Sequence, residues 1–313
     1  MSSPSQNLTI VMYHFVRDVA GTPFDRLPVR TIAEIDRQFD AIASTCNVVG
    51  LDQMHAALHG EDILPENPVL LTFDDGYREH YEVVFPRLRA RDWSAVFFPA
   101  TSVLESPVVL NVNKIQFLRT CIAPEELYSA LLTWLDENRE AHSLNQTETY
   151  LARWAIANRF DDPHAMFVKN MLQRGLPSIA RQQLTDELFA QSVTKDEADF
   201  SHALYMNRDE IAEMAHNGMS IGVHGHSHDW MTDLSPDRLQ YELKHSLSIM
   251  ENCGVTTEKW CLCYPFGGVN TAVRATAAAL GATSAVTTEP RVANLRNDDA
   301  LLLPRLDTND LPH

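Results

Sequence analysis

The sequence predicts an α/β fold of parallel strands and covering helices, interrupted by a large helical insertion. Over the first hundred residues, and again after residue 207, short apolar runs alternate with segments whose apolar residues recur every three or four positions. Such alternation is typical of parallel strands connected by helices. Between residues 106 and 206 the signals are nearly all helical. We therefore expect one α/β domain over residues 8–105 and 207–309, with residues 106–206 inserted into it.

The amino-terminal part of this domain is predicted to run strand, helix, strand, helix, strand, helix, strand. The strands are short apolar runs, and the helices carry apolar residues at helical spacing, as at Ile32, Ile35 and Phe39. The expected bounds of these elements are 8–12, 31–44, 46–51, 52–59, 69–73, 78–91 and 94–99.

Four helices are expected in the insertion, and the strand–helix alternation then returns. Asn207 is a suitable N-cap for a helix that ends before Gly218, and Ser235 caps a longer helix that ends before Gly254. A strand leads to His224 between these two helices. The helices of the insertion are expected at 124–142, 147–160, 164–174 and 178–191. The final elements are expected at 260–264, 271–280, 282–287 and 301–306.

The composition excludes several classes of protein. The 313 residues carry a formal net charge of −17 and no run of Lys and Arg, which argues against nucleic acid or an anionic membrane as a partner. No apolar run approaches the roughly 18 residues of a membrane span, and the first residues lack a secretion signal, so we expect a cytoplasmic protein. Five cysteines without CxxC spacing indicate reduced thiols rather than a disulfide framework.

Two of the expected strands end in side chains suited to metal-dependent hydrolysis. The apolar run 69–73 ends in Asp74 and Asp75, and a later run ends in His224, with His226 and His228 just beyond it. Neighbouring side chains at a strand end point in different directions, so one carboxylate can bind a metal while the other acts as a base. One carboxylate and two imidazoles suit zinc or another first-row divalent ion. The residues alone allow either the 224/228 or the 224/226 pair of histidines.

Three further strand ends carry residues that could contribute to the same site. These are His14, the segment 264–267 (Tyr-Pro-Phe-Gly), and Arg305 with Asp307. In a barrel of parallel strands the carboxyl ends meet at one mouth. Such convergence would bring all five strand ends together.

The residues at these strand ends resemble the signatures of the polysaccharide deacetylases, the NodB-like carbohydrate esterases of family four. The segment Thr72–Gly76 looks like the first signature of that family, and His224 and His228 match the two histidines of the second. Segment 264–267 resembles the third signature, and residues 303–305 resemble a late leucine-containing segment.

The resemblance implies a distorted (β/α) barrel of the NodB-homology type and a divalent metal, by default Zn²⁺. The metal would be held by Asp75, His224 and His228. Asp74 would be the general base that acts on a water molecule, and a backbone N–H near Phe266 would stabilise the oxyanion that forms.

The sequence departs from the family pattern at three positions. Gly225 replaces the Ser or Thr that follows the first metal histidine, and Ser227 is the candidate to supply the missing hydroxyl. Cys261 replaces an arginine that orients the general base, and Arg305 is the candidate to take over that role. The late histidine that protonates the leaving amine is absent, and we favour His14 over His226 as its replacement.

These expectations describe a hydrolase that removes an N-acyl group, by default N-acetyl, from an amino sugar in the biosynthesis of a surface polysaccharide such as lipopolysaccharide. The substrate would be a glycan or a nucleotide- or lipid-linked sugar, and the helical insertion could mediate homo-oligomers. One alternative uses the same site for another C–N hydrolysis or for acyl exchange. The other alternative is a degenerate barrel that only binds glycan.

Overall fold

The computed structural model describes residues 6–156 and 162–311, and within this part the chain forms two compact units. The α/β unit comprises the described parts of residues 1–18, 29–106 and 202–313, and the helical unit comprises those of 19–28 and 107–201. Residues 19–28 fall outside the α/β unit in which they are expected from the sequence. They belong to the helical unit because Phe24 packs edge-on against Phe117 and Phe200.

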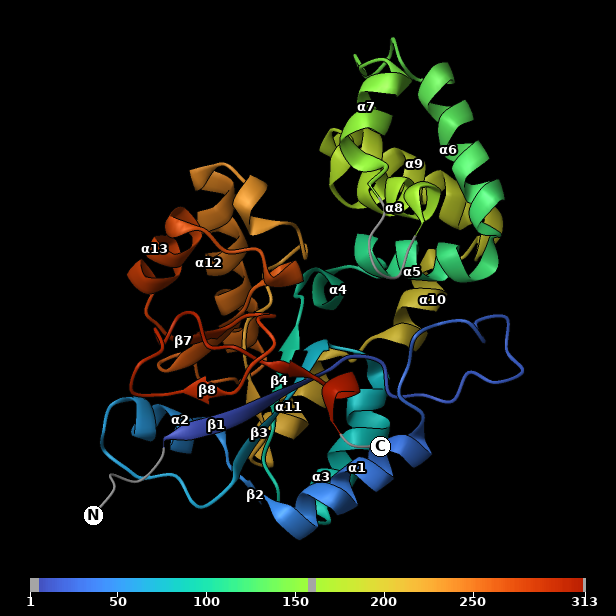
Figure 1. The fold of residues 1–313 in the computed structure, drawn as a ribbon. Helices are drawn as coiled ribbons and strands as arrows, with labels where there is room; N and C mark the ends of the chain where they lie inside the picture. The colour runs from blue at the N-terminus through green and yellow to red at the C-terminus, as the bar shows by residue number, and fades with distance from the viewer. Residues whose placement is uncertain (1–5, 157–161, 312–313) are drawn as a thin grey trace. The chain divides into compact units, whose positions relative to one another are not determined.

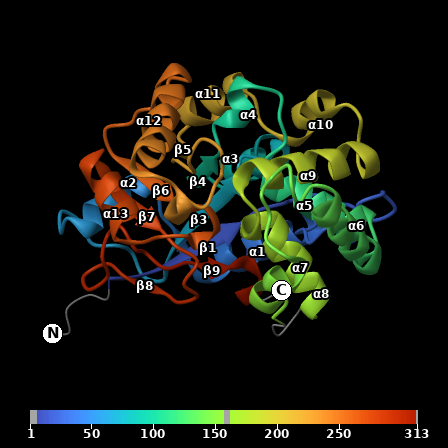
Figure 2. The same cartoon turned by 90° about the horizontal axis from the view of Figure 1, so that it is seen from above.

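The α/β unit is built on parallel strands whose carboxyl ends are level. Strand β1 (Asn7–Tyr13) pairs with β3 (Pro68–Asp75), which pairs with β4 (Val96–Pro99), and the register aligns Tyr13, Phe73 and Phe97. Figure 2 shows β5, β4, β3, β1 and β9 following one another across the unit. The short outer strands are β2 (Asn47–Val48), β5 (Ser220–Ile221), β8 (Ala293–Asn294) and β9 (Leu306–Asp307).

A second, two-stranded parallel sheet continues the path of the first. It consists of β6 (Trp260–Cys263) and β7 (Ala282–Val286). Single parallel bridges join the two sheets, one between Val223 and Leu262 and one between Val286 and Leu303. The fold is therefore an α/β barrel of distorted form, in which the hydrogen-bonded ladder is interrupted at these two places.

The two faces of the central strands have different neighbours. In β3, Leu71 and Phe73 pack among helices α1 (Ile32–Thr45), α3 (Phe85–Arg89) and α11 (Arg208–His216), which Figure 1 shows grouped beside these strands. Leu70, on the opposite face, packs with Cys261 and Cys263 of β6 and Val286 of β7, and we call this group the inner layer. Side chains two apart in a strand share a face, so Asp74 points into this inner layer, toward Cys263 of β6.

Polar caps fix the starts of several helices, as the sequence indicated. The Asn207 side chain accepts a hydrogen bond from the Glu210 N–H, and Glu210 reciprocates, which completes a capping box. At the start of α12 (Pro236–Asn252) the Ser235 hydroxyl accepts a hydrogen bond from the Arg238 N–H. The remaining elements of the α/β unit are α2 (Leu51–Leu58), α4 (Ser102–Glu105), α13 (Thr271–Ala279), and short turns of helix at Met231–Asp233, Pro265–Gly267 and Thr308–Asp310.

Two predicted elements differ from the structure because of proline. The segment expected as a helix at 78–91 is helical over residues 78–89, with a π-helical turn at His80–Val84 that leads into α3. Pro86 has no N–H to continue an α-helical ladder, and the Phe85 N–H bonds instead to the His80 carbonyl. The strand expected at 301–306 is wrong over most of its length, since only Leu306 pairs with β1 and Pro304 interrupts the ladder before it.

One further prediction needs correction, and one strand of the structure was not predicted. The strand expected to reach His224 ends at Ile221. At Gly222, the next residue, an added Cβ would lie 2.3 Å from the Phe98 ring. The two-residue strand β8 is too short to show a periodic signal in the sequence.

The helical unit has its own core of leucines and aromatic residues. Lys114 is buried there, with its Nζ 2.7 Å from Glu197 and 5.6 Å from the centre of the Phe189 ring.

The helix expected at 147–160 is α7 (Thr147–Trp154), and the end expected at residue 160 lies outside the described residues. The other helices are α5 (Asn111–Cys121), α6 (Pro124–Glu137), α8 (Pro163–Asn170) with a π-helical turn at Met171–Gly175, α9 (Ser178–Ser192) and α10 (Glu197–Leu204), which crosses the boundary between the units.

Helix length and polarity also bear on membrane insertion. Among the described residues, no helix is both long enough and apolar enough to cross a bilayer.

A buried histidine makes the stability of the α/β unit sensitive to acid. His55 of α2 is 1% exposed, and its Nε2 lies 2.8 Å from the Ser284 hydroxyl of β7. Burial lowers the pKa of His55 from 6.5 to about 4, so the unfolded chain takes up this proton at a higher pH than the folded chain does. Stability contributed by the neutral ring is therefore present above pH 6.5 and is lost as the pH falls toward 4.

We expect the free energy of unfolding of wild type to fall by about 2 kcal/mol more than that of His55→Gln between pH 7 and pH 5. Urea unfolding of both proteins at the two pH values measures this difference. Parallel pH dependences of the two proteins would contradict it.

Candidate metal and catalytic site

Three buried side chains from two strand ends converge on one point of the α/β unit. The Oδ1 atom of Asp75, at the end of β3, lies 3.4 Å from His224 Nε2 and 3.3 Å from His228 Nε2. Zinc–ligand bonds of about 2.0–2.1 Å in a tetrahedral site place ligand atoms about 3.4 Å apart. Asp75 Oδ1 is buried and accepts no hydrogen bond within the described part of the chain. This donor set therefore fits a zinc-type ion, and it contains His228 rather than His226.

The backbone is held in unusual conformations where these side chains emerge. Asp75 and His228 have φ angles of +73° and +56°, in the left-handed region that costs L-residues energy. Gly76 follows with φ +78°, and a Cβ there would lie 2.6 Å from the Cβ of Pro99. Glycine is therefore required after the two aspartates for β3 to turn beside β4.

Further groups orient two of the converging side chains. The Tyr77 hydroxyl donates to Asp75 Oδ2 at 2.6 Å, which turns Oδ1 toward the histidines. His224 Nδ1 lies 2.8 Å from the Cys263 carbonyl oxygen, so that nitrogen is the donor and Nε2 presents its lone pair. Burial alone would raise the pKa of the Asp75 carboxyl, but His224 and His228 outweigh it and hold that pKa well below its usual range.

Asp74 is paired with Arg305 on the inner side of the strands. Two parallel hydrogen bonds of 2.8 Å join the guanidinium to the two carboxylate oxygens, and Arg305 Nε donates to the Thr287 carbonyl at 2.9 Å. Both side chains are buried. Burial alone would raise the pKa of Asp74, but the charge and hydrogen bonds of Arg305 lower it to about 2. Asp74 is thus ionised at neutral pH.

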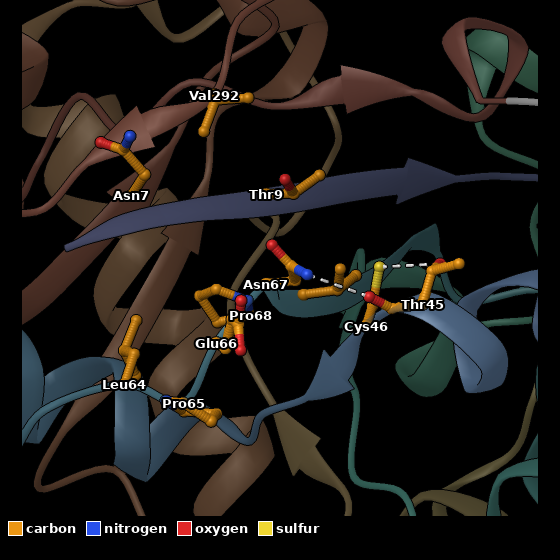
Figure 3. Close-up of a pocket in the computed structure, with 11 residues that line it drawn as sticks. Asn7, Thr9, Thr45, Cys46, Leu64, Pro65, Glu66, Asn67, Pro68 and Val292 are labelled. Carbon is orange, nitrogen blue, oxygen red and sulfur yellow. Dashed lines mark hydrogen bonds between the residues drawn. The ribbon is translucent and has the colours of Figure 1, made fainter. Parts of the chain in front are cut away.

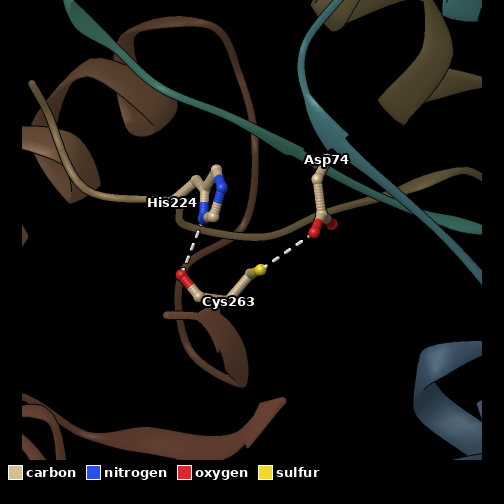
Figure 4. A group of neighbouring side chains, drawn as sticks. All are labelled: Asp74, His224 and Cys263. Carbon is tan, nitrogen blue, oxygen red and sulfur yellow. Dashed lines mark hydrogen bonds between the residues drawn. The ribbon is translucent and has the colours of Figure 1, made fainter. Parts of the chain in front are cut away.

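The thiol of Cys263 lies against the same carboxylate. Its Sγ is 3.3 Å from Asp74 Oδ2 and 3.2 Å from Arg305 Nη2, and Figure 4 shows it between Asp74 and His224. Burial raises the pKa of this thiol, so it stays protonated and can donate to Asp74. Cys261, two residues earlier in β6, is buried in the inner layer.

His14 lies beside Asp74, and His226 has a different set of contacts. His14 follows β1, its Nε2 is 3.9 Å from Asp74 Oδ2, and its side chain is 39% exposed. The buried His80 ring bonds to the His14 carbonyl and so fixes the backbone there. The His226 ring contacts Thr101, Glu105 and His245 instead.

Phe266 lies in the turn after β6, where its ring contacts His228. Its ring stacks on Trp230 with a centroid distance of 4.7 Å and meets the His228 ring edge-on at 4.7 Å. Phe266 has φ +58°, and the hydrogen bonds of this turn are donated by the N–H groups of Gly267 and Gly268. The Phe266 N–H takes no part in them.

Glu242 of α12 holds the loop that carries both histidines. This carboxylate is 1% exposed and accepts hydrogen bonds of 2.8 Å from the His226 and Ser227 N–H groups and of 2.9 Å from the Ser227 hydroxyl. Ser227 thus supplies a hydroxyl contact within this loop. Gly225 has φ +73°, and an added Cβ there would lie 3.1 Å from Met231 and 3.5 Å from Glu242, so a larger residue would be strained.

Three residues of this site were not singled out in the sequence. Tyr77 lies two residues after Asp75, and its position beside a charged pair was an available signal. Cys263 alternates with Cys261 in a strand and gave no sign of which face it would occupy. Glu242 lies 15 residues beyond Ser227 on an amphipathic helix, where an acidic residue is expected to face solvent.

A cavity in the α/β unit lies at the opposite end of the strands. Figure 3 shows that it is lined by residues at the amino ends of β1 and β3, including Asn7, Thr9 and Pro68, and by Cys46. Glu66 is its one ionisable side chain besides that cysteine. The cavity has no part in the converging site described above.

Comparison with known proteins identifies the family. The family model for polysaccharide deacetylases matches residues 62–151 and 151–285, which is more than half of the chain. The chain therefore belongs to the polysaccharide deacetylase family, as the resemblance of its motifs indicated.

Individual relatives are similar over different shares of the chain. Poly-beta-1,6-N-acetyl-D-glucosamine N-deacetylase of Escherichia coli (strain K12) is 36% identical over 111 residues, which are 35% of this chain and 16% of that protein. The Streptococcus pyogenes deacetylase PplD, solved with acetate, aligns with a TM-score of 0.61 and 17% identity over 97% of this chain and 93% of its own. The BpsB deacetylase domain from Bordetella bronchiseptica aligns with a TM-score of 0.57 and 19% identity over 97% of each chain. The two structures share this fold.

Proposed function

We propose that this protein is a metal-dependent hydrolase that removes an N-acetyl group from an amino sugar of a polysaccharide. The observation that carries this proposal is the convergence of buried Asp75, His224 and His228 beside the ionised Asp74–Arg305 pair. This arrangement separates a set of metal ligands from a charged carboxylate that is free to accept a proton, and amide hydrolysis needs both.

The donor set favours Zn²⁺ or a neighbouring first-row divalent ion. Asp75, His224 and His228 would hold it through one oxygen and two nitrogen atoms. Such an ion would supply Lewis acidity that polarises the acyl carbonyl and makes water acidic near neutral pH. Membership of the polysaccharide deacetylase family supports this assignment.

Asp74 and His14 would carry out the two proton transfers of the reaction. Asp74 accepts a proton from the water that attacks the acyl carbon, while Arg305 keeps its carboxylate oriented. The Phe266 N–H is the donor assigned to the oxyanion. His14 donates a proton to the amide nitrogen as the C–N bond breaks, so water and amide become acetate and a free amine. Its partial exposure leaves it accessible to a sugar in the mouth.

The substrate class is proposed from the similarity to the E. coli enzyme, whose name specifies poly-beta-1,6-N-acetyl-D-glucosamine. A polymer of N-acetylglucosamine destined for a surface polysaccharide is therefore the first substrate to test. Nucleotide- or lipid-linked N-acetyl sugars are the next.

The experiment that tests the proposal measures acetate and free amine released from N-acetylglucosamine oligomers. We expect both products in equal amounts from zinc-loaded wild type, neither from Asp75→Ala, and slower release from His14→Ala. Activity on a cyclic amide or on acyl exchange, with no acetate from any amino sugar, would favour the alternative C–N hydrolase. A protein that binds the oligomers and releases nothing would favour a glycan-binding barrel.

Glu242→Ala is expected to weaken zinc binding by about 10–100-fold, because it removes the carboxylate that fixes the loop carrying His224 and His228. Competition with a chromophoric chelator measures the affinity. Gln240→Ala, at an exposed position of the same helix, is the matched control and should leave it unchanged. Equal zinc affinity in Glu242→Ala and wild type would show that the loop needs no such support.

A further inference from the structure

A second group of metal-ligating side chains lies on the outer side of the histidine loop. Glu105 at the end of α4, His226 in the loop and His245 of α12 place one ligand atom each within 4.8 Å of one another. Glu105 Oε2 lies 2.7 Å from His245 Nε2 and 3.8 Å from His226 Nε2. These separations lie on either side of the roughly 3.4 Å expected between ligands of tetrahedral zinc.

The orientation of His226 is fixed by a buried polar chain behind it. Its Nδ1 lies 3.1 Å from the Thr101 hydroxyl, and that hydroxyl lies 3.1 Å from Ser246, whose own hydroxyl bonds to the Glu242 carbonyl. Thr101 and Ser246 are fully buried. A metal-binding histidine is commonly held in this way through its other ring nitrogen, which leaves Nε2 directed at the ion.

The side chains of this cluster are more exposed to solvent than those of the Asp75 site. The side chains of Glu105 and His245 are 35% and 30% exposed, and that of His226 is 13% exposed. Tyr241 stacks on the His245 ring at 4.9 Å and meets His226 edge-on, so the two imidazoles are held on one side of the cluster. One carboxylate and two imidazoles leave a tetrahedral ion a fourth position for water.

The geometry points to a second binding site for a zinc-type divalent cation at Glu105, His226 and His245. The ion would join α4, the loop and α12. Hydrogen bonds from the Thr101 and Ser102 N–H groups to the Gly225 and His226 carbonyls already link two of these segments. An ion there would therefore immobilise the loop whose other histidines belong to the Asp75 site, and it would stabilise the fold by binding the native state alone.

Equilibrium dialysis of the chelator-stripped full-length protein against Zn²⁺, followed by metal analysis, tests the site. We expect two ions per chain in wild type and one in His245→Ala. His216→Ala removes an exposed histidine elsewhere and should still bind two. Asp75→Ala should retain the ion at this second site, which separates this inference from the proposed deacetylase site. Thermal unfolding should show a zinc-dependent rise in Tm in Asp75→Ala that the double variant Asp75→Ala/His245→Ala lacks.

Two results would overturn the inference. One is a wild type that takes up a single ion at saturating zinc. The other is a His245→Ala protein that matches wild type in zinc content, which would leave Glu105 and His245 as an ordinary surface ion pair.

Discussion

Asp74→Asn is expected to lower the rate of deacetylation by about 10²–10⁴-fold, the usual contribution of a general base. The substitution keeps the shape of the side chain and one acceptor for Arg305, but it removes the negative charge that accepts the proton. The metal ligands are untouched, so zinc content should stay near one ion per chain at the Asp75 site. Initial rates of acetate release, with metal analysis of the same preparation, measure both quantities.

The comparison with Asp75→Asn makes this prediction specific. That variant should lose the ion of the Asp75 site and the activity together, whereas Asp74→Asn should lose activity alone. An Asp74→Asn enzyme within a few-fold of wild type would assign the general base to another residue, with His14 the nearest candidate.

Arg305→Met is expected to destabilise the α/β unit by about 3–5 kcal/mol, because it leaves the Asp74 carboxylate buried without its counter-charge. Five hydrogen bonds of the guanidinium, to Asp74, Thr72, Thr287 and Cys263, are lost with it. Activity should fall as well, since Asp74 is no longer held in one orientation. Urea unfolding gives the free-energy change.

Two further variants distinguish this pair from an ordinary ion pair. Arg291→Met breaks contacts to Asp298 and Glu289 at the surface and should cost about 0–1 kcal/mol. Asp74→Asn/Arg305→Met should be less destabilised than the sum of the two single variants, because no charge is left buried alone. Additive effects, or a cost for Arg305→Met as small as that for Arg291→Met, would contradict the account.

The sequence predicted the class of fold because its signals were local. An apolar run ending in Asp74, Asp75 and Gly76 identifies a strand end and the turn after it, and N-caps such as Asn207 identify helix starts. The family signatures lie in these same segments, so the resemblance and the local pattern pointed to one place. The bridges that join the two sheets, Val223 with Leu262 and Val286 with Leu303, involve single residue pairs and give no periodic signal in the sequence.

The contacts that define the candidate site are mostly long-range. Asp74 and Arg305 are 231 residues apart, and Arg305 was predicted only as the replacement for the family's arginine, whose position Cys261 occupies. The choice between His226 and His228 depends on the conformation of the loop, in which Gly225 and His228 have left-handed φ angles. In this loop His228 faces Asp75, whereas His226 faces Glu105. Glu242 contacts that loop from the buried face of α12. An acidic residue is expected on the exposed face of such a helix, so its burial could not be predicted from the sequence.

Metal analysis of purified wild type beside Asp75→Ala and His228→Ala tests the central claim most directly. The proteins are stripped, reloaded with zinc and dialysed against a weak chelator that removes loosely held ions. The account predicts a tightly held ion in wild type that both variants lack, with all three proteins folded by circular dichroism. A wild type that retains no ion after reloading, or variants that retain as much as wild type, would contradict it.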